Sequence, residues 1–169
     1  MKILFLDFDG VLNTDSYRRK LLENGKMISD NFGPLFDPAA TDNLKKIVDA
    51  VPGLVIMITS SWKVTHDFSW FKELWSQRNM PGQIRLLPDY VPEIDFSQVN
   101  EEDIYLLSGK GYEIKHWFEM SAPDNCKFAI LDDMRIFLPE QLPYLVQTDP
   151  LYGITEKEVR KVVELLTKD

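Results

Sequence analysis

The sequence predicts an α/β fold: a Rossmann-like, doubly wound parallel sheet with helices on both faces. Continuously apolar segments at 2–8, 54–59 and 127–131, and a weaker one at 144–147, have the pattern of short strands that are buried on both sides. Segments with helical spacing of apolar residues separate them, and strands that alternate with helices form parallel sheets. The chain of 169 residues has the length of one domain with a substantial core, so we expect a single domain over 1–169.

The helices expected between these strands have recognisable starts. Asp37 is followed by Pro38, and this pair favours a helix start because the Asp side chain accepts hydrogen bonds from the first N–H groups and proline fits the first turn. Further helices are expected at 67–78, at 110–120 and after the capping box formed by Thr155 and Glu158. Two segments interrupt the alternation. We expect 14–36 to be a flap or loop insert, and 80–106, which prolines interrupt, to be irregular.

Composition and charge argue against several classes of protein. The formal net charge of −8 disfavours a long duplex nucleic-acid surface, which needs positive charge. The compact basic cluster is Arg18-Arg19-Lys20, so an anionic ligand would have to be bound locally. No apolar run approaches the roughly 20 residues that span a bilayer, and the N-terminus lacks the shape of a signal peptide. A lone Cys126 cannot form an intramolecular disulfide, and we expect a cytoplasmic protein without membrane contact.

Polar side chains follow three of the predicted strands. They are Asp7 and Asp9 after the first strand, Thr59 and Ser60 after the second, and Asp132 and Asp133 after the third. Ligands of parallel sheets bind beyond the carboxyl ends of the strands, so we expect these groups at one edge of the sheet. A set of carboxylates is rich in the oxygen ligands that suit Mg²⁺. A calcium-binding loop fails on spacing, because Leu12 would stand where that loop needs glycine and Arg18 where it needs glutamate.

Five stretches carry a resemblance to a known family. They are LDFDGVLN (6–13), VIMITSSW (55–62), GKGYEIKHW (109–117), AILDDM (129–134) and TDPLYGIT (148–155). In this order they resemble the haloacid dehalogenase (HAD) superfamily of phosphatases with an aspartate nucleophile, and most of all the HAD domain of Swiss Army Knife RNA repair proteins. The resemblance implies a HAD-like fold. Neither 14–36 nor 80–106 is long enough for a folded cap domain, so we expect a capless or minimally capped site.

The resemblance implies a role for each acidic residue. Asp7 would be the nucleophile that becomes an aspartyl phosphate. Asp9 would be the general acid and base, which protonates the leaving group and then activates water. Asp133, with Asp132 beside it, would complete a Mg²⁺ site together with Asp7 and the backbone carbonyl of Asp9.

The resemblance also implies which groups bind the phosphate. Thr59 would donate a hydrogen bond to a phosphoryl oxygen, with Ser60 as the alternative if the strand ends one residue later. Gly10 would let the chain turn after the acidic pair, so that loop N–H groups meet the phosphate. A lysine that steadies the nucleophile and the phosphate would be Lys110, where the subfamily usually has arginine. Lys115, one helical turn further on, is the alternative.

A Mg²⁺-dependent phosphomonoesterase is therefore the leading functional prediction. We expect an uncapped site to accept the terminal phosphate of a polynucleotide, with Arg18, Arg19 and Lys20 near the adjoining backbone phosphates. One alternative is a small-metabolite or nucleotide phosphatase of the same superfamily. Another is a non-catalytic phosphate-binding or interaction module, whose mark would be the loss of Asp7 or Asp9, and neither is lost.

Other conspicuous side chains are more typical of structural positions. Four tryptophans favour a core over a base-stacking platform: Trp62, Trp70, Trp75 and Trp117. His66 and His116 have no partners at the spacing of a metal or catalytic site, and we expect both to be structural or surface residues.

Overall fold

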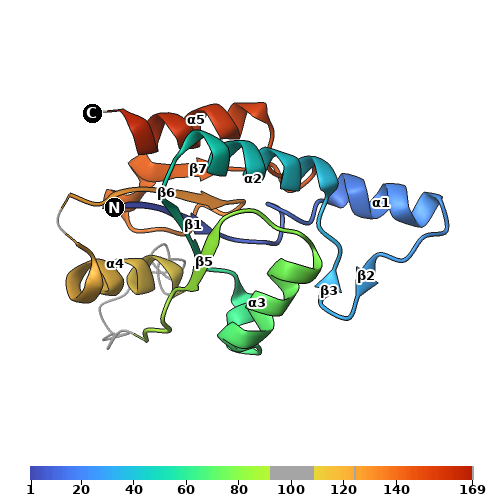
Figure 1. Cartoon of the computed structure of the whole chain (residues 1–169), viewed down its shortest axis with the longest axis horizontal. Coiled ribbons are helices and arrows are strands. Elements are labelled where there is room, and N and C mark those ends of the chain that lie inside the picture. The colour runs from blue at the N-terminus through green and yellow to red at the C-terminus, as the bar shows by residue number, and fades with distance from the viewer. Residues whose placement is uncertain (92–108, 124, 169) are drawn as a thin grey trace, which may run out of the picture.

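A five-stranded parallel sheet forms the centre of the protein. The computed structural model describes residues 1–91, 109–123 and 125–168 (Figure 1). The strand order is β5-β4-β1-β6-β7, and all four pairings are parallel. The strands are β1 (Lys2–Leu6), β4 (Leu54–Ile58), β5 (Gln83–Leu86), β6 (Lys127–Asp132) and β7 (Leu145–Gln147). The predicted parallel α/β fold is confirmed.

Helices and a small hairpin complete the chain. The α-helices are α1 (Asp15–Glu23), α2 (Pro38–Ala50), α3 (Phe68–Gln77), α4 (Lys110–Ser121) and α5 (Glu156–Thr167). Two short 3₁₀ segments are η1 (Ser61–Val64) and η4 (Pro139–Tyr144). The hairpin consists of β2 (Ser29–Asp30) and β3 (Gly33–Pro34). Every helix in the described ranges falls short of the length and apolarity that a membrane-spanning helix requires.

The side chains of β1 alternate between two layers of core. Leu4 and Leu6 pack into the core that α2, α3 and α5 cover. Ile3 and Phe5 face the other core, to which α4 contributes buried side chains. Figure 1 shows α2 and α5 together on one side of the sheet and α4 on the other. Because β1 is buried on both faces, its sequence is continuously apolar rather than alternating.

Two predicted helix starts are confirmed in detail. The Asp37 side chain accepts a hydrogen bond from the backbone N–H of Ala39 at 2.9 Å, and Pro38 occupies the first turn of α2. Thr155 and Glu158 form the expected capping box at the start of α5. These local interactions satisfy N–H groups that the helix itself leaves unpaired.

The two segments predicted to be inserts are more regular than expected. The prediction that 80–106 is irregular is wrong for 83–86, which form the edge strand β5; the part from 92 onward lies outside the described residues. Gln83 and Arg85 are exposed, whereas Ile84 and Leu86 pack on the core, so polar and apolar residues alternate along this edge strand. Such a short alternating segment between prolines has the sequence pattern of a loop. The segment 14–36 contains α1 and the hairpin of β2 and β3.

The topology determines where a ligand can bind. The chain leaves β1 through α2 to reach β4 on one side of β1, and the later strand β6 pairs with β1 on the other side. The order of the strands therefore reverses between β1 and β6. Such a switch point opens a crevice at the carboxyl ends of the strands, where ligands of doubly wound folds bind.

Candidate active site

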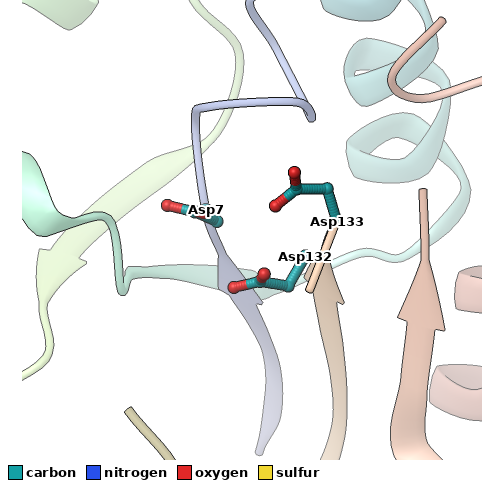
Figure 2. Close-up of side chains that lie close together, drawn as sticks. All are labelled: Asp7, Asp132 and Asp133. Atoms are coloured by element: carbon teal, nitrogen blue, oxygen red, sulfur yellow. The ribbon is translucent and has the colours of Figure 1, made fainter. Parts of the chain in front are cut away.

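Three carboxylates converge at the switch point. Asp7 follows β1, Asp132 ends β6, and Asp133 is the next residue (Figure 2). Each offers a carboxylate oxygen, and these oxygens lie within 4.8 Å of one another. Asp7 is 5% exposed and Asp132 is fully buried. Buried carboxylates are costly unless a cation or hydrogen-bond donors compensate their charge, so this arrangement requires a positive partner.

The positive partner within the protein is Lys110, the first residue of α4. Its Nζ lies 2.9 Å from Oδ2 of Asp7 and 2.8 Å from Oδ2 of Asp132. Burial alone would lower the pKa of Lys110, but the charges of Asp7 and Asp132 outweigh it and raise this pKa, so the ammonium form is favoured. Lys115, the alternative that the sequence left open, is exposed further along α4. The geometry therefore favours Lys110.

The cluster still carries excess negative charge. Burial and the neighbouring charge of Asp7 raise the pKa of Asp132 to about 6, although Lys110 and the backbone N–H of Met134 lower it in part. Burial and Asp7 also raise the pKa of Asp133. Three carboxylates face one ammonium group, and all the ligand atoms are oxygens. This donor set fits Mg²⁺, which would remove the repulsion between the carboxylates.

Gly10 provides space for Asp133. Its φ of +70° lies in the left-handed region, and a Cβ at this position would come within 2.6 Å of Oδ2 of Asp133. Its N–H group, which was expected near the phosphate, donates instead to the backbone oxygen and the Oδ1 of Asn13 at 3.0 and 3.1 Å. In this arrangement Gly10 serves the geometry of the loop rather than contributing a free N–H group.

Asp9 lies apart from the carboxylate cluster. Its side chain is exposed, and both of its oxygens accept hydrogen bonds. Nδ2 of Asn13 donates to Oδ1 at 2.7 Å, and the indole Nε1 of Trp62 donates to Oδ2 at 3.0 Å. Sequence reasoning missed both donors. The asparagine after "DGVL" and the tryptophan after "SS" were the available signals, but neither carries a spacing rule that links it to Asp9.

The hydroxyls after β4 have different environments. Oγ1 of Thr59 is buried and has no hydrogen-bond partner within the part of the chain that the structure describes. Oγ of Ser60 accepts a hydrogen bond from the backbone N–H of Trp62 and caps η1. A buried hydroxyl without a partner is costly unless a ligand supplies one. Of the two alternatives, Thr59 is therefore better suited to a phosphoryl oxygen.

The TDPLYGIT stretch supports the loop that carries the acidic pair. Oγ1 of Thr148 donates to the backbone oxygen of Gly10 at 2.9 Å, and the backbone N–H of Ile154 donates to that of Val11 at 3.1 Å. A Cβ at Gly153 would lie 2.3 Å from the oxygen of Val11, so only glycine allows this approach. The stretch is thus part of the site's support, although none of its side chains belongs to the carboxylate cluster.

Contacts from two neighbouring segments fix α4, and with it Lys110. Lys63 in η1 forms an ion pair with Glu113 of α4 at 2.9 Å, and both side chains are largely buried. Nε2 of Gln141 donates to the backbone oxygen of Gly111 at 2.8 Å. Because these contacts lie within the first turn of α4, they restrict the position from which Lys110 reaches the carboxylates.

The basic cluster of the 14–36 segment divides into two parts. Arg18 lines a pocket of about 350 Å³, and Asp9, Gly10 and Asp133 line the same pocket. Arg19 and Lys20 are exposed on α1 and do not line this pocket. The structure therefore places one of the three predicted substrate contacts beside the site.

Comparisons with known proteins bear on the family and the fold. The family model for the HAD domain in Swiss Army Knife RNA repair proteins matches residues 3–159. The structure is similar to that of the HAD domain of the effector protein Lem4 from Legionella pneumophila, which was solved as an inactive mutant. The two sequences are 17% identical, the match covers 98% of this chain and 94% of that chain, and the TM-score is 0.52. A second structure of the Lem4 HAD domain has 19% identity, coverage of 99% and 97%, and a TM-score of 0.49. No curated protein matches the chain. At such low identity the structural similarity indicates the fold.

Proposed function

Because this chain belongs to the family of HAD domains in Swiss Army Knife RNA repair proteins, we propose that it is a Mg²⁺-dependent phosphomonoesterase that acts through an aspartyl phosphate on Asp7. One observation carries the proposal: the two acids of the DxD pair occupy different environments. Asp7 is buried in the cluster with Lys110, whereas Asp9 is exposed and bound by two N–H donors. Different environments suit a nucleophile and a general acid.

The reaction then has two steps on the chain's own residues. In the first, a carboxylate oxygen of Asp7 attacks phosphorus, the bond from phosphorus to the ester oxygen breaks, and Asp9 donates a proton to the departing oxygen. In the second, Asp9 accepts a proton from a water molecule whose oxygen attacks phosphorus. Inorganic phosphate leaves and the Asp7 carboxylate is restored.

Charge on the phosphoryl oxygens is stabilised by groups around Asp7. Lys110 provides an ammonium group, and Oγ1 of Thr59, which has no partner among the described residues, could donate to a phosphoryl oxygen. Asp7 and Asp133 are the candidate metal ligands, with Asp132 beside them, because Lys110 and Met134 already donate to the oxygens of Asp132. Bound Mg²⁺ would neutralise charge on the carboxylates and on the phosphoryl group.

Trp62 and Asn13 hold the Asp9 carboxylate, the proposed source of the leaving group's proton. Each donates to one oxygen of Asp9, and this pair of bonds fixes the orientation of a carboxylate that lies outside the three-acid cluster but lines the same pocket as Asp133. A general acid must lie within hydrogen-bond reach of the departing oxygen, so its orientation matters as much as its acidity. We propose both residues as positioning residues for Asp9.

The terminal phosphate of a polynucleotide is the proposed substrate. The family description names RNA repair, and Arg18 provides a cation beside the site for an adjoining backbone phosphate. A second candidate is a nucleotide phosphatase, because the pocket of about 350 Å³ beside Asp9 has the size of a small-molecule site. A non-catalytic module is disfavoured, since Asp7, Asp9 and Lys110 are all present.

Hydrolysis of 4-nitrophenyl phosphate with Mg²⁺ and with excess EDTA tests the reaction. We expect turnover with the metal and none with EDTA, with recovery when Mg²⁺ is added back. Activity that is equal in both conditions would contradict the metal-dependent mechanism. The substrate is tested by comparing 5′- or 3′-phosphorylated oligonucleotides with mononucleotides and sugar phosphates. We expect the highest kcat/KM for an oligonucleotide, and a clear preference for the small metabolites would support the second candidate.

A further inference from the structure

Half-buried aromatic side chains line a groove beside Asp9. Phe32, Trp62, His66 and Trp70 contribute its rings, and Asn31, Ser61 and Thr65 its polar groups; its volume is about 340 Å³. The sequence predicts a core position for all four tryptophans. Trp75 and Trp117 are buried, at 6% and 8% exposure, whereas Trp62 and Trp70 are half-buried: they pack against the core and also line this groove. The parts of these rings that the core leaves uncovered offer apolar surface to a ligand in the groove.

The walls of the groove are held in place from both sides. The ring of His66 stacks on Trp70 with 3.8 Å between centroids and 6° between planes, and Trp70 contacts Trp62 and Phe32 edge to face. The opposite wall is the hairpin of β2 and β3. Arg78 fixes this hairpin, donating to Oδ1 of Asp30 at 2.7 Å and to the backbone oxygen of Pro34 at 2.9 Å. The groove is therefore largely preformed, which reduces the entropic cost of binding.

The groove adjoins the candidate active site through Trp62. The indole ring of Trp62 forms part of its wall, and Nε1 of the same ring donates to Oδ2 of Asp9. In the proposed mechanism Asp9 protonates the oxygen of the leaving group. The leaving group must then lie within hydrogen-bond reach of Asp9, and its next chemical unit is close to Trp62. The groove thus adjoins the leaving-group side of the reaction.

We propose that this groove binds the nucleobases adjacent to the terminal phosphate of a single-stranded polynucleotide. This inference rests on the proposed function, and it adds which form of substrate is preferred. Every base has a flat face that can stack on an aromatic ring, and loss of one such contact weakens binding roughly 5- to 150-fold. Bases inside a duplex are already stacked and paired, so a duplex end offers only the outer face of its terminal pair and no second base.

Charge also favours this occupant over a long duplex. The protein has a formal net charge of −8, so electrostatic attraction to many phosphates cannot supply the affinity. Stacking in the groove needs no net positive charge, and Asn31, Ser61 and Thr65 offer donors and acceptors for base edges. A phosphopeptide would use its backbone and charged side chains, and among the residues that the structure describes the groove is lined by no Lys, Arg, Asp or Glu.

The test replaces Trp70 by alanine and leaves Trp62 unchanged, since Trp62 contacts Asp9. The substrates are a terminally phosphorylated single-stranded tetranucleotide and 4-nitrophenyl phosphate, both with Mg²⁺. We expect Trp70→Ala to lower kcat/KM for the tetranucleotide about tenfold, mainly through a higher KM, and to leave the aryl phosphate unchanged. The control is Tyr144→Ala, which removes another exposed ring, from the residue before β7 and hence near the amino-terminal edge of the sheet. It should change neither substrate.

A binding measurement separates this inference from the proposed function. Quenching of tryptophan fluorescence by an unphosphorylated tetranucleotide, in EDTA, reports occupation of the groove without turnover, and a blunt duplex should quench far less. Absence of quenching, equal quenching by the duplex, or an unchanged tetranucleotide KM in Trp70→Ala would overturn the groove assignment even if the aryl phosphate is hydrolysed. Preference for a phosphopeptide that depends on Trp70 would also overturn it. Absence of all hydrolysis alongside quenching that Trp70→Ala abolishes would refute the proposed function and retain the groove.

Discussion

The two sides of the site differ in how they are built. The side that contains Asp7, Asp132 and Asp133 is formed by the ends of two neighbouring strands; Asp7 and Asp132 are buried there and Asp133 is half-buried. The side around Asp9 is formed by a loop, by η1 and by the hairpin, and its side chains are exposed or half-buried. In the proposed reaction, the first side would carry out the same chemistry on any phosphate ester. The second side would contact the group to which the phosphate is attached, and so would determine the choice of substrate.

This difference teaches which interactions each side can tolerate losing. On the buried side, charges compensate one another at separations near 3 Å, and removal of one leaves another uncompensated. On the exposed side, water can replace a lost partner. We therefore expect substitutions on the buried side to affect every substrate and to change stability. Substitutions on the exposed side should change the relative rates of different substrates.

The largest effect is expected for Asp7→Asn. The amide cannot form the aspartyl phosphate, so hydrolysis of 4-nitrophenyl phosphate should fall by at least about a thousandfold. The fold should persist, because the substitution preserves the shape of the side chain and removes one of three mutually repelling carboxylates. Asp42→Asn, an exposed substitution on α2, is the matched control and should retain full activity. If Asp7→Asn kept more than a few per cent of the rate, Asp7 would not be the nucleophile.

The second effect separates two lysines on α4. Lys110→Ala should lower kcat for all substrates by about a hundredfold, because it removes a positive group from the phosphoryl site and leaves Asp7 and Asp132 without their cation. Lys115→Ala removes an exposed charge from the same helix and should leave kcat within about twofold of wild type. Steady-state kinetics with the aryl phosphate measure both. The reverse pattern would assign the role to Lys115.

A third effect concerns the stability of the metal-free protein. The pKa of Asp132 is raised from 3.8 to about 6, so the folded state favours the protonated acid. The protonated Asp132 side chain stabilises the folded state fully below about pH 4, and this stabilisation is lost as pH rises through 6. The total loss is about 3 kcal/mol, roughly half of it between pH 5 and pH 7.5.

Urea unfolding in EDTA at these two pH values measures that loss. Asp132→Asn cannot ionise, and its free energy of unfolding should fall less between the two pH values than that of the wild type. Mg²⁺ should restore stability to the wild type at pH 7.5, because a ligand that binds only the folded state stabilises it. Identical pH dependence of the two proteins would show that the charge of Asp132 is compensated in some other way.

The fold and the buried side were predictable because their signals are local. The strands β1, β4 and β6 are continuous apolar runs, and the acids at the ends of β1 and β6 and the hydroxyls after β4 follow directly in sequence. The edge strand β5 escaped prediction, since a half-buried strand alternates and has weak sequence contrast. The bond from Trp62 to Asp9 joins residues 53 positions apart, and no periodic pattern encodes it. The same holds for the placement of Trp70 on a surface, because composition alone cannot distinguish a groove from a core.

The Trp62→Phe variant tests whether the exposed side orients Asp9. This variant keeps an aromatic ring but removes the N–H group that donates to Asp9. A poorly oriented general acid matters little for 4-nitrophenol, a good leaving group, and more for an alkoxide. We expect kcat/KM to fall about tenfold for an alkyl phosphate and less than about threefold for the aryl phosphate. Trp70→Phe, in the same aromatic cluster but without contact to Asp9, should leave kcat/KM unchanged for both the alkyl and the aryl phosphate. An equal loss for both leaving groups would indicate a structural role for Trp62.

The smallest effect is expected at the basic residues of α1, where the structure sharpens the prediction made from sequence. Arg18 lines the pocket beside Asp9, whereas Arg19 and Lys20 are exposed outside it. If Arg18 contacts one backbone phosphate of an oligonucleotide, the slope of log(kcat/KM) against log of salt should flatten by about 0.7 in Arg18→Ala. Between about 50 and 200 mM salt, this corresponds to roughly a threefold smaller loss of activity. Arg19→Ala, the neighbouring residue of the same charge, should retain the wild-type slope, and the aryl phosphate should be insensitive to both changes.

Equal slopes for Arg18→Ala and Arg19→Ala would mean that the α1 cluster acts as a diffuse positive surface. The exposed side would then select substrates through the aromatic groove without help from a specific phosphate contact.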